Sequence, residues 1–303
     1  MTQDRTRPEG KRPQIDARRR AESRARAALP PLTPEEEARP FAKYFYEEIK
    51  PCDPAHYALM DRPVDPARAF GPGEINRLLD VGRLETEEVE IGWCLLPDGV
   101  GFVANRMFHP GVTADMIDWW FAWHALEDLR YRIWYPPQHA GIALGHADRA
   151  RILDPGIPNR EKNWGVTHHV TENCGCGMES IDIGFRSPAD MGFDMERFYG
   201  VAATFAGGEG WSVPIDAGDD AVAAPAIMCH VFYEVPGGLV QRTRFWMGCR
   251  FTEPGRAESC LPPGVAVPAA PVQGLAQHNV REFTRLGDLL PRIYRELGPG
   301  MEC

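Results

Sequence analysis

A histidine and a glutamate four residues apart in the C-terminal part of the sequence have the spacing of two metal ligands on one helix. Residues 275–287 show helical periodicity, and Leu275, His278, Glu282 and Leu286 fall on a single stripe. An imidazole and a carboxylate at positions i and i+4 point the same way and can bind one ion together. The same pair on a solvated face would contribute only about 0.2–0.5 kcal/mol as an ion pair. Because both polar groups interrupt an apolar stripe, the pattern favours a buried metal site.

A second histidine lies on the aromatic face of another predicted helix. Thr113 is typical of an N-cap residue, and Trp120, Phe121 and His124 share one face of the helix predicted at residues 115–126. An unpaired polar group on such a face would cost free energy. His124 is therefore either a core histidine with one hydrogen-bond partner or, together with the downstream pair, a metal ligand.

A further ligand is expected from the chain between these two helices. Glu161 precedes a predicted strand and is the preferred candidate. Neighbouring residues of a strand point to opposite faces, so at most one of His168 and His169 can face a shared site. The alternatives that stay open are Asp154, His168, His169 and Glu172.

The remaining histidines and a pair of cysteines carry weaker signals. His230 lies in a strongly apolar predicted strand, where it is either a hydrogen-bonded core residue or a group that faces a cavity. His109 is interpreted as a surface turn residue, and His139 as a solvated loop residue. Cys174 and Cys176 have no second cysteine pair at zinc-ribbon spacing, so this motif is interpreted as a flexible turn.

The composition is that of a soluble globular protein. The chain has 303 residues, of which 44% are hydrophobic and 25% are charged. The formal net charge of −10 argues against nucleic acid as a partner. Eight cysteines in a chain of this length do not form a dense disulfide framework, and no apolar run approaches the roughly 20 residues of a membrane span. We therefore expect a cytoplasmic protein that does not associate with membranes.

Three regions follow one another along the chain. Residues 1–32 are rich in arginine without a hydrophobic segment behind them, which predicts a disordered or loosely helical basic tail rather than a secretory signal. Residues 33–85 are interrupted by prolines and predict short helices in an N-terminal cap or dimerisation segment. Residues 86–303 form the predicted main domain.

The main domain has the pattern of antiparallel strands. Apolar and polar residues alternate from residue 87, and turn signals at residues 97–99 and 236–238 each predict a hairpin. Residues 165–170 and 180–185 predict two more strands, whereas the glycine-rich residues 203–225 are interpreted as an excursion between elements. Hairpins combined with two substantial helices predict an α+β antiparallel architecture. The sequence has neither βαβ alternation nor a glycine-rich phosphate loop, which argues against a nucleotide-binding fold.

Three motifs together point to a known family. The aromatic segment WWFAWH, which ends at His124, is followed by LRYRIW at residues 129–134. His278 and Glu282 form the second motif, and RFWMG at residues 244–248 forms the third. These motifs resemble those of the 2,4-diacetylphloroglucinol hydrolase and phloretin hydrolase family, and the similarity covers roughly residues 87–297.

The resemblance implies a fold, a metal and a set of site residues. It implies a helix-grip, Bet v 1-like fold, in which an antiparallel sheet wraps a long helix, and an N-terminal segment that supports a homodimer. His230 is the implied catalytic histidine near the ring hydroxyls of the substrate. Asp154 and Glu172 stay open as alternatives to one ligand, Glu161. The implied zinc ligands are His124, Glu161, His278 and Glu282, and the implied contacts of the aromatic substrate are Trp120, Trp123 and Tyr131.

The implied activity is zinc-dependent hydrolysis of a small aromatic ketone. The bond between an acyl group and a phloroglucinol-type ring would be cleaved to give a phloroglucinol derivative and a carboxylic acid. Zinc lowers the pKa of bound water to about 7 and polarises a carbonyl, and a polyhydroxylated ring can leave through its keto tautomer. Two alternatives stay open: a non-catalytic helix-grip carrier or sensor of an aromatic ligand, and a non-haem iron oxygenase. The acyl chain and ring pattern of the substrate are not determined by the sequence.

Overall fold

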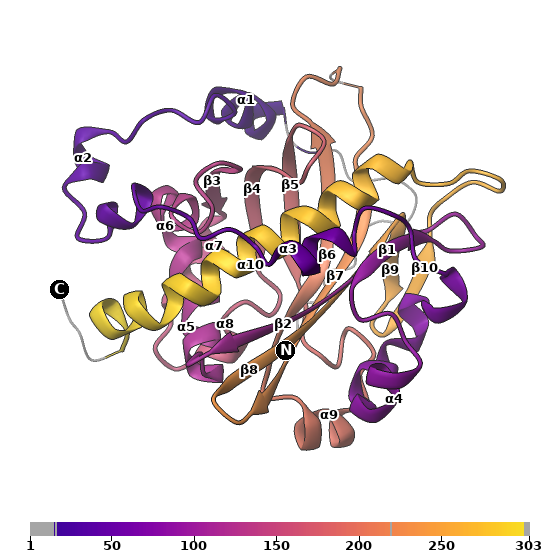
Figure 1. The fold of residues 1–303 in the computed structure, drawn as a ribbon. Coiled ribbons are helices and arrows are strands. Elements are labelled where there is room, and N and C mark those ends of the chain that lie inside the picture. Colours follow the sequence, from indigo (N-terminus) through magenta and orange to yellow (C-terminus); the bar gives the residue numbers. More distant parts are fainter. Residues whose placement is uncertain (1–14, 16, 219, 300–303) are drawn as a thin grey trace, which may run out of the picture.

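An eight-stranded antiparallel sheet and one long helix form the centre of the molecule (Figure 1). The computed structural model describes residue 15 and residues 17–218 and 220–299. The large sheet has the strand order β1-β2-β8-β7-β6-β5-β4-β3, and β10 and β9 form a separate small sheet. The strands are β1 (Gly92–Leu95), β2 (Gly101–Pro110), β3 (His139–Leu144), β4 (Thr167–Asn173), β5 (Met178–Phe185), β6 (Thr204–Pro214), β7 (Ala224–Val235), β8 (Gly238–Met247), β9 (Cys249–Glu253) and β10 (Arg256–Ser259).

Short helices surround the sheet, and the long helix α10 lies across it (Figure 1). The α-helices are α1 (Ala17–Arg26), α2 (Pro34–Glu37), α3 (Pro54–Ala58), α4 (Val81–Thr86), α5 (Ala114–Trp123), α6 (Asp128–Arg132), α7 (His146–Leu153), α8 (Asn159–Lys162), α9 (Met195–Val201) and α10 (Ala269–Leu297). The 3-10 helices are η1 (Ala42–Phe45), η2 (Pro66–Arg68), η3 (Pro72–Leu79) and η4 (His124–Leu126). Helices and an antiparallel sheet in one chain agree with the predicted α+β class.

The helix predicted at residues 275–287 is confirmed, and it is part of a longer one. α10 has 29 residues and contacts β1, β2 and α5. The predicted stripe faces inward, because His278, Glu282 and Leu286 are all buried. A Cβ on Gly175, which follows β4, would lie 2.5 Å from the Cα of Gly274 in α10, so only glycine permits this backbone-to-backbone approach. The close contact holds the polar part of the stripe over the strands.

The interpretation of residues 203–225 as an excursion is wrong. This stretch contains β6, which pairs with β5 on one side and β7 on the other. Glycine weakens a strand signal because it has no side chain to pack. Here it is needed, since a Cβ on Gly208 would lie 2.1 Å from the carbonyl oxygen of Gly184 on β5. The glycines that suggested a loop instead allow two strands to approach closely.

The described part of the basic N-terminal region is a helix packed on the sheet rather than a solvated tail. α1 contacts β3, β4 and β5, and Ser23 forms buried hydrogen bonds with Ser180 Oγ (3.0 Å) and Thr171 Oγ1 (2.8 Å). Arg26 pairs with Asp128 at 3.0 Å. These side-chain partners lie on distant elements, so the arginine-rich composition alone does not reveal them. Residues 1–14 of the predicted tail lie outside the described residues.

Replacing Arg20 by alanine is expected to loosen α1. Arg20 is buried, and its guanidinium donates hydrogen bonds to the backbone oxygens of Ala217 and Gly218. Losing these bonds should lower the free energy of unfolding by about 1–3 kcal/mol, measurable by urea denaturation. The control is Arg18→Ala, because the Arg18 side chain is 85% exposed and should contribute less than about 0.5 kcal/mol. Equal effects of the two substitutions would contradict the docking of α1.

Residues 33–85 form short helices, as predicted, and pack against the main body. Tyr44 is buried in the same core cluster as α5 and α10 residues, and Arg285 of α10 donates a hydrogen bond to its backbone oxygen at 2.8 Å. Phe70 and Leu78 join a second core cluster with strands of the large sheet. The role of this segment in dimerisation stays a prediction. Across the described residues, no helix combines the length and the hydropathy needed to cross a membrane.

Candidate metal centre

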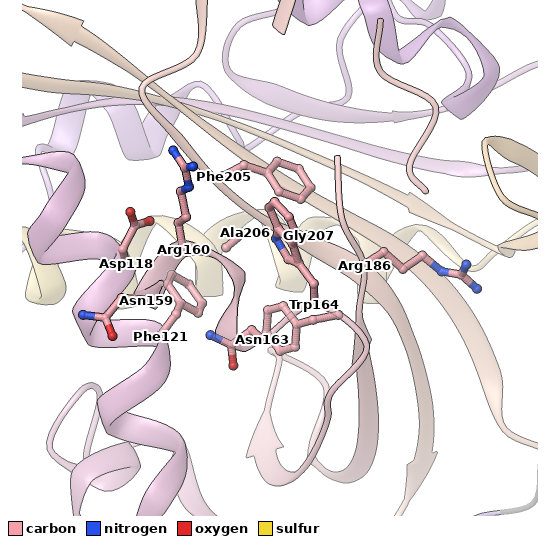
Figure 2. A pocket seen from close by; sticks show the side chains of 11 residues that line it. Asp118, Phe121, Asn159, Arg160, Asn163, Trp164, Arg186, Phe205, Ala206 and Gly207 are labelled. Carbon is pink, nitrogen blue, oxygen red and sulfur yellow. The ribbon is translucent and has the colours of Figure 1, made fainter. Parts of the chain in front are cut away.

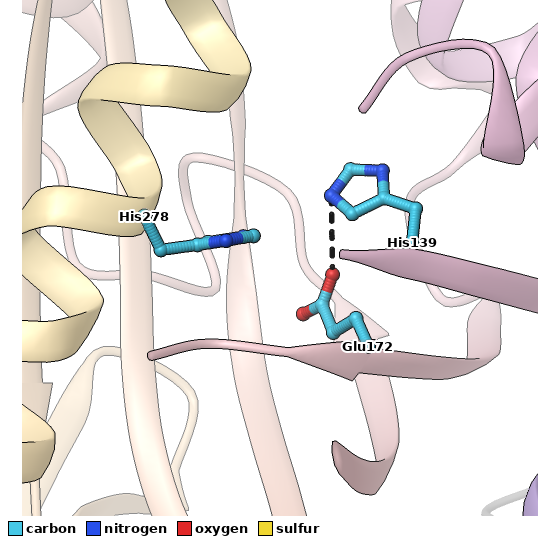
Figure 3. Close-up of side chains that lie close together, drawn as sticks. All are labelled: His139, Glu172 and His278. Atoms are coloured by element: carbon cyan, nitrogen blue, oxygen red, sulfur yellow. Dashed lines mark ion pairs between the residues drawn. The ribbon is translucent and has the colours of Figure 1, made fainter. Parts of the chain in front are cut away.

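Four buried side chains from β3, β4 and α10 converge at one point. His139 begins β3 and lies opposite Glu172 in the register with β4, while His278 and Glu282 project from α10. Ligand atoms of His139, Glu172 and His278 lie within 4.8 Å of one another (Figure 3). The Nε2 atom of His139 is 3.5 Å from Glu172 Oε2 and 3.5 Å from Glu282 Oε2, and His278 Nε2 is 3.7 Å from Glu282 Oε2.

The hydrogen bonds of the two histidines leave the inward-facing nitrogens free to bind a cation. The Nδ1 atom of His139 lies 3.4 Å from the backbone oxygen of Tyr131, which can only accept, so this nitrogen carries the proton. The Nδ1 atom of His278 is 3.1 Å from Gln138 Oε1 and is held in the same way. His139 Nε2 is buried and has no hydrogen-bond partner among the described residues. Imidazoles oriented by an outer hydrogen bond are typical of metal ligands.

The two carboxylates are also held from outside. Glu172 accepts hydrogen bonds from the hydroxyl of Tyr131 and from Cys174 Sγ (3.3 Å). Glu282 Oε1 accepts a hydrogen bond from Asn279 Nδ2 at 3.2 Å. Asn279 Oδ1 in turn accepts one from Asn105 Nδ2 at 3.0 Å. Ligand atoms of a tetrahedral site with metal distances near 2.1 Å lie roughly 3.4 Å apart. The observed separations of 3.5–3.7 Å therefore fit a single divalent ion.

Burial makes this group electrostatically unfavourable without a cation. Burial raises the pKa of Glu282 to about 8, although the nearby His278 lowers it in part. Burial lowers the pKa values of His139 and His278 to about 4. At neutral pH both imidazoles are therefore neutral, which is the form that binds metals. A divalent cation would stabilise the charged form of Glu282.

The structure brings together two of the four ligands implied by the resemblance and places the other two elsewhere. Glu161 lies on α8 with a third of its side chain exposed, and it contacts Arg160. His124 ends α5, where its ring stacks on Trp120 and its Nδ1 atom lies 2.7 Å from the backbone oxygen of that residue. Neither side chain belongs to the group of His139, Glu172 and His278. Glu172, one of the alternatives kept open, is in the group.

Two histidines that the sequence placed at the surface are buried. The interpretation of His139 as a solvated loop residue is wrong, because its exposed fraction is 0%. The available signal was the apolar run of residues 139–144, which forms β3. His109 is not a surface turn residue either, since it is buried in β2 and bonds Gln241 Oε1 at 2.7 Å. Of the adjacent histidines on β4, His168 is buried and His169 is half-buried, as expected for opposite faces.

A cavity of about 540 Å³ opens between the sheet and α10 beside the four acidic and imidazole groups. Glu172, His278 and Glu282 line it. Tyr131 also lines it, whereas Trp120 and Trp123, the other predicted substrate contacts, are not among its lining residues. The cavity wall further contains His124, His168 and His230 and apolar side chains that include Trp134, Ile181, Phe185, Met228, Phe245 and Leu275.

A second hollow lies next to this cavity but has little space. It has a volume of about 10 Å³ and is bordered by Asp118 and Asn163 (Figure 2). Asp118 accepts a hydrogen bond from Thr204, and burial raises the pKa of its carboxyl to about 6. Phe121 and Phe185 border both spaces. A volume of this size admits one water molecule, so the larger cavity is the candidate substrate site.

Comparison with known proteins identifies the family of the chain. Residues 71–295 match the family model described as the DAPG hydrolase PhiG domain. The chain belongs to this family. It is 34% identical over 264 residues to phloretin hydrolase of Eubacterium ramulus, a match that covers 86% of this chain and 92% of the relative. It is 31% identical over 270 residues to 2,4-diacetylphloroglucinol hydrolases of a Pseudomonas species and of Pseudomonas protegens, covering 86% of this chain and 89% and 85% of those relatives.

The matched range of the DAPG hydrolase family contains the whole candidate centre. His139, Glu172, His278 and Glu282 all lie between residues 71 and 295, as does every strand of the large sheet. The docked helix α1 lies outside this range. The resemblance found in the sequence motifs is thereby confirmed.

Proposed function

We propose that the chain is a zinc-dependent hydrolase that cleaves the carbon–carbon bond between an acyl group and a phloroglucinol-type ring. The products are a phloroglucinol derivative and a carboxylic acid. The observation that carries this proposal is the buried group of His139, Glu172 and His278, with Glu282 3.5–3.7 Å from the two histidines, beside a largely apolar cavity in a chain of the DAPG hydrolase family. The names of the relatives in that family supply the substrate class.

The proposed zinc ligands are His139, Glu172, His278 and Glu282. They replace His124 and Glu161 of the sequence-based set because the inward-facing atoms of these four residues lie at ligand spacing. Imidazole nitrogen and carboxylate oxygen are ordinary zinc donors. When bound, zinc would polarise the acyl carbonyl and lower the pKa of a water molecule to about 7.

The cavity walls orient the aromatic ring and exclude bulk water. Met228, Phe185 and Phe245 provide apolar surface on which a flat ring packs. Tyr131 lines the cavity and holds Glu172 through its hydroxyl, so it positions a ligand as well as the substrate. His230, the proposed catalytic histidine, is buried at the cavity wall and neutral, because burial lowers its pKa to about 3. We assign it to an oxygen of the leaving ring.

The arrangement of one long helix across an antiparallel sheet supports the helix-grip, Bet v 1-like fold that the resemblance implies. We propose that the fold serves to enclose the substrate between α10 and the strands, where the cavity lies. Assembly as a homodimer and a cytoplasmic location stay predictions from the sequence.

Product analysis of the purified protein tests the proposed reaction. The protein is incubated with 2,4-diacetylphloroglucinol or with phloretin, before and after dialysis against a chelator. Formation of the carboxylic acid and the deacylated ring, lost on dialysis and restored by zinc, is the expected result. Recovery of both compounds unchanged from a zinc-loaded protein would indicate a carrier, and oxygen consumption would indicate an oxygenase.

A further inference from the structure

Four buried polar side chains form a continuous hydrogen-bonded chain that ends at the cavity. His109 Nε2 lies 2.7 Å from Gln241 Oε1, and Gln241 Nε2 lies 2.8 Å from Thr243 Oγ1. Thr243 Oγ1 lies 2.8 Å from the Nδ1 atom of His230, its cross-strand neighbour. Gln241 Nε2 is also 3.3 Å from the same nitrogen. None of the four residues is more than 3% exposed, and among them only His230 lines the cavity.

Such a chain has two self-consistent directions, and they differ in what His230 presents to the cavity. If Gln241 donates toward Thr243 and His230, the Nδ1 atom of His230 accepts and its Nε2 atom carries the proton. If the amide is reversed, Thr243 donates to Gln241, His230 donates from Nδ1, and Nε2 becomes an acceptor. The proton on His109 distinguishes the two cases, because the reversed amide would require the proton of His109 on Nδ1 instead of Nε2.

The surroundings of His109 select the first direction. Its Nδ1 atom has no hydrogen-bond partner among the described residues and lies against Gly287 of α10, where a Cβ would come within 2.6 Å. A proton on this atom would point at the helix, where the described residues offer it no acceptor. A proton on His109 Nε2 is instead accepted by Gln241 Oε1. In this orientation the Gln241 amide nitrogen also faces both Thr243 Oγ1 and His230 Nδ1.

We infer that His109, Gln241 and Thr243 are positioning residues that hold His230 in the tautomer with the proton on Nε2, so that it donates a hydrogen bond into the cavity. His124, also on the cavity wall, has the opposite polarity. Its Nδ1 proton is directed at the backbone oxygen of Trp120, which leaves Nε2 as an acceptor. His230 and His124 thus present opposite polarities to the cavity, a donor and an acceptor.

The consequence for catalysis rests on the proposed function. When the bond to the acyl group breaks, electron density moves to an oxygen of the ring, and a fixed donor stabilises that charge more in the transition state than in the ground state. A neutral imidazole with its proton on Nε2 is suited to this role. Removing such a donor from an acyl-transfer site typically lowers kcat by about 100- to 1,000-fold.

The tautomer of His230 is directly measurable by long-range proton–nitrogen correlation spectra of the zinc-loaded, nitrogen-15-labelled protein. The spectrum of His230→Gln identifies the signals. The expected result for the wild-type protein is a protonated Nε2 and an unprotonated Nδ1. An unprotonated Nε2 in the wild-type protein would overturn the inference, whether or not the protein hydrolyses acylphloroglucinols.

Substitutions of Gln241 test whether the direction of its hydrogen bonds, rather than its packing, sets the tautomer of His230. In Gln241→Glu the side chain can only accept, so Thr243 must donate to it and His230 should move its proton to Nδ1. In Gln241→Leu the direction is no longer imposed, and His230 should become a mixture of both tautomers. Thr243→Ser retains the hydroxyl and is the matched control, with an unchanged spectrum. A His230 spectrum unchanged in both Gln241 variants would overturn the inference.

Kinetic measurements test the inferred positioning of His230 separately from the proposed function. Gln241→Glu should lower kcat by about 10- to 1,000-fold with a smaller change in KM and an unchanged zinc content, because the donor is lost mainly in the transition state. Full kcat in a variant whose tautomer has reversed would overturn the catalytic part of the inference. An inactive wild-type protein with the predicted tautomer would instead contradict the proposed function. The inferred positioning of His230 would still hold.

Discussion

Substitution of His139 by alanine is expected to remove the bound metal and to lower hydrolysis by on the order of a thousandfold. His139 Nε2 is buried without a hydrogen-bond partner among the described residues, and it lies 3.5 Å from Glu172 Oε2 and from Glu282 Oε2. Removing it takes one ligand from the middle of the group and leaves the two carboxylates facing each other. Elemental mass spectrometry should give about one zinc per chain for the wild-type protein and almost none for the variant.

Two control variants separate this ligand set from the one implied by the sequence motifs. Glu161→Ala changes a partly exposed side chain on α8 and should retain both the metal and full activity. His124→Ala should retain the metal but lower activity, since His124 lines the cavity without joining the group. Metal loss in either variant with retention in His139→Ala would contradict the proposed centre.

Substitution of Glu282 by glutamine is expected to stabilise the metal-free protein at high pH while preventing metal binding. The pKa of Glu282 is raised from 4.5 to about 8 in the folded protein, so the fold favours the protonated form. Stability from this group is fully present below pH 4.5 and is lost as the pH rises through 8. A neutral amide avoids this loss, which amounts to on the order of 3–5 kcal/mol by pH 9.

Urea unfolding of the metal-free proteins at pH 5 and pH 9 measures this effect. Wild-type protein and Glu282→Gln should differ little at pH 5, and the variant should be the more stable at pH 9. The pKa values of His139 and His278, lowered to about 4, cause a loss of stability toward acid in both proteins, so comparing the two at each pH largely removes that contribution. Added zinc should reverse the order at pH 9 by stabilising only the wild-type protein. If the metal-free variant were less stable than wild type at pH 9, the raised pKa of Glu282 in the folded protein would be contradicted.

The half of the centre on α10 was predictable from the sequence because both residues lie on one helix. Periodicity alone puts His278 and Glu282 on the same face, and their interruption of an apolar stripe indicates burial. The other half depends on strand register. His139 and Glu172 are 33 residues apart and meet because β3 pairs with β4, and the spacing in the sequence carries no trace of that pairing.

Local patterns also explain the other successes and errors. Thr113 correctly predicted the start of α5, because its side chain accepts a hydrogen bond from the backbone of Met116. The aromatic face of α5 was correctly predicted to be buried, yet Trp120 packs against neighbouring rings instead of lining the cavity. Hydrophobic periodicity identifies an inward face but not whether that face meets a ligand or other side chains. The glycines of β6 failed as a loop signal for a related reason, since close strand approach is a tertiary property.

Hydrolysis in water enriched with oxygen-18 tests the proposed metal-dependent carbon–carbon cleavage most directly. Zinc-loaded protein is incubated with 2,4-diacetylphloroglucinol, and the released carboxylic acid is examined by mass spectrometry. The proposed reaction predicts one oxygen-18 atom in each carboxylic acid molecule, unlabelled ring oxygens, and about a thousandfold less product with His139→Ala. Release of acid without label from the water, or undiminished product with His139→Ala, would contradict it.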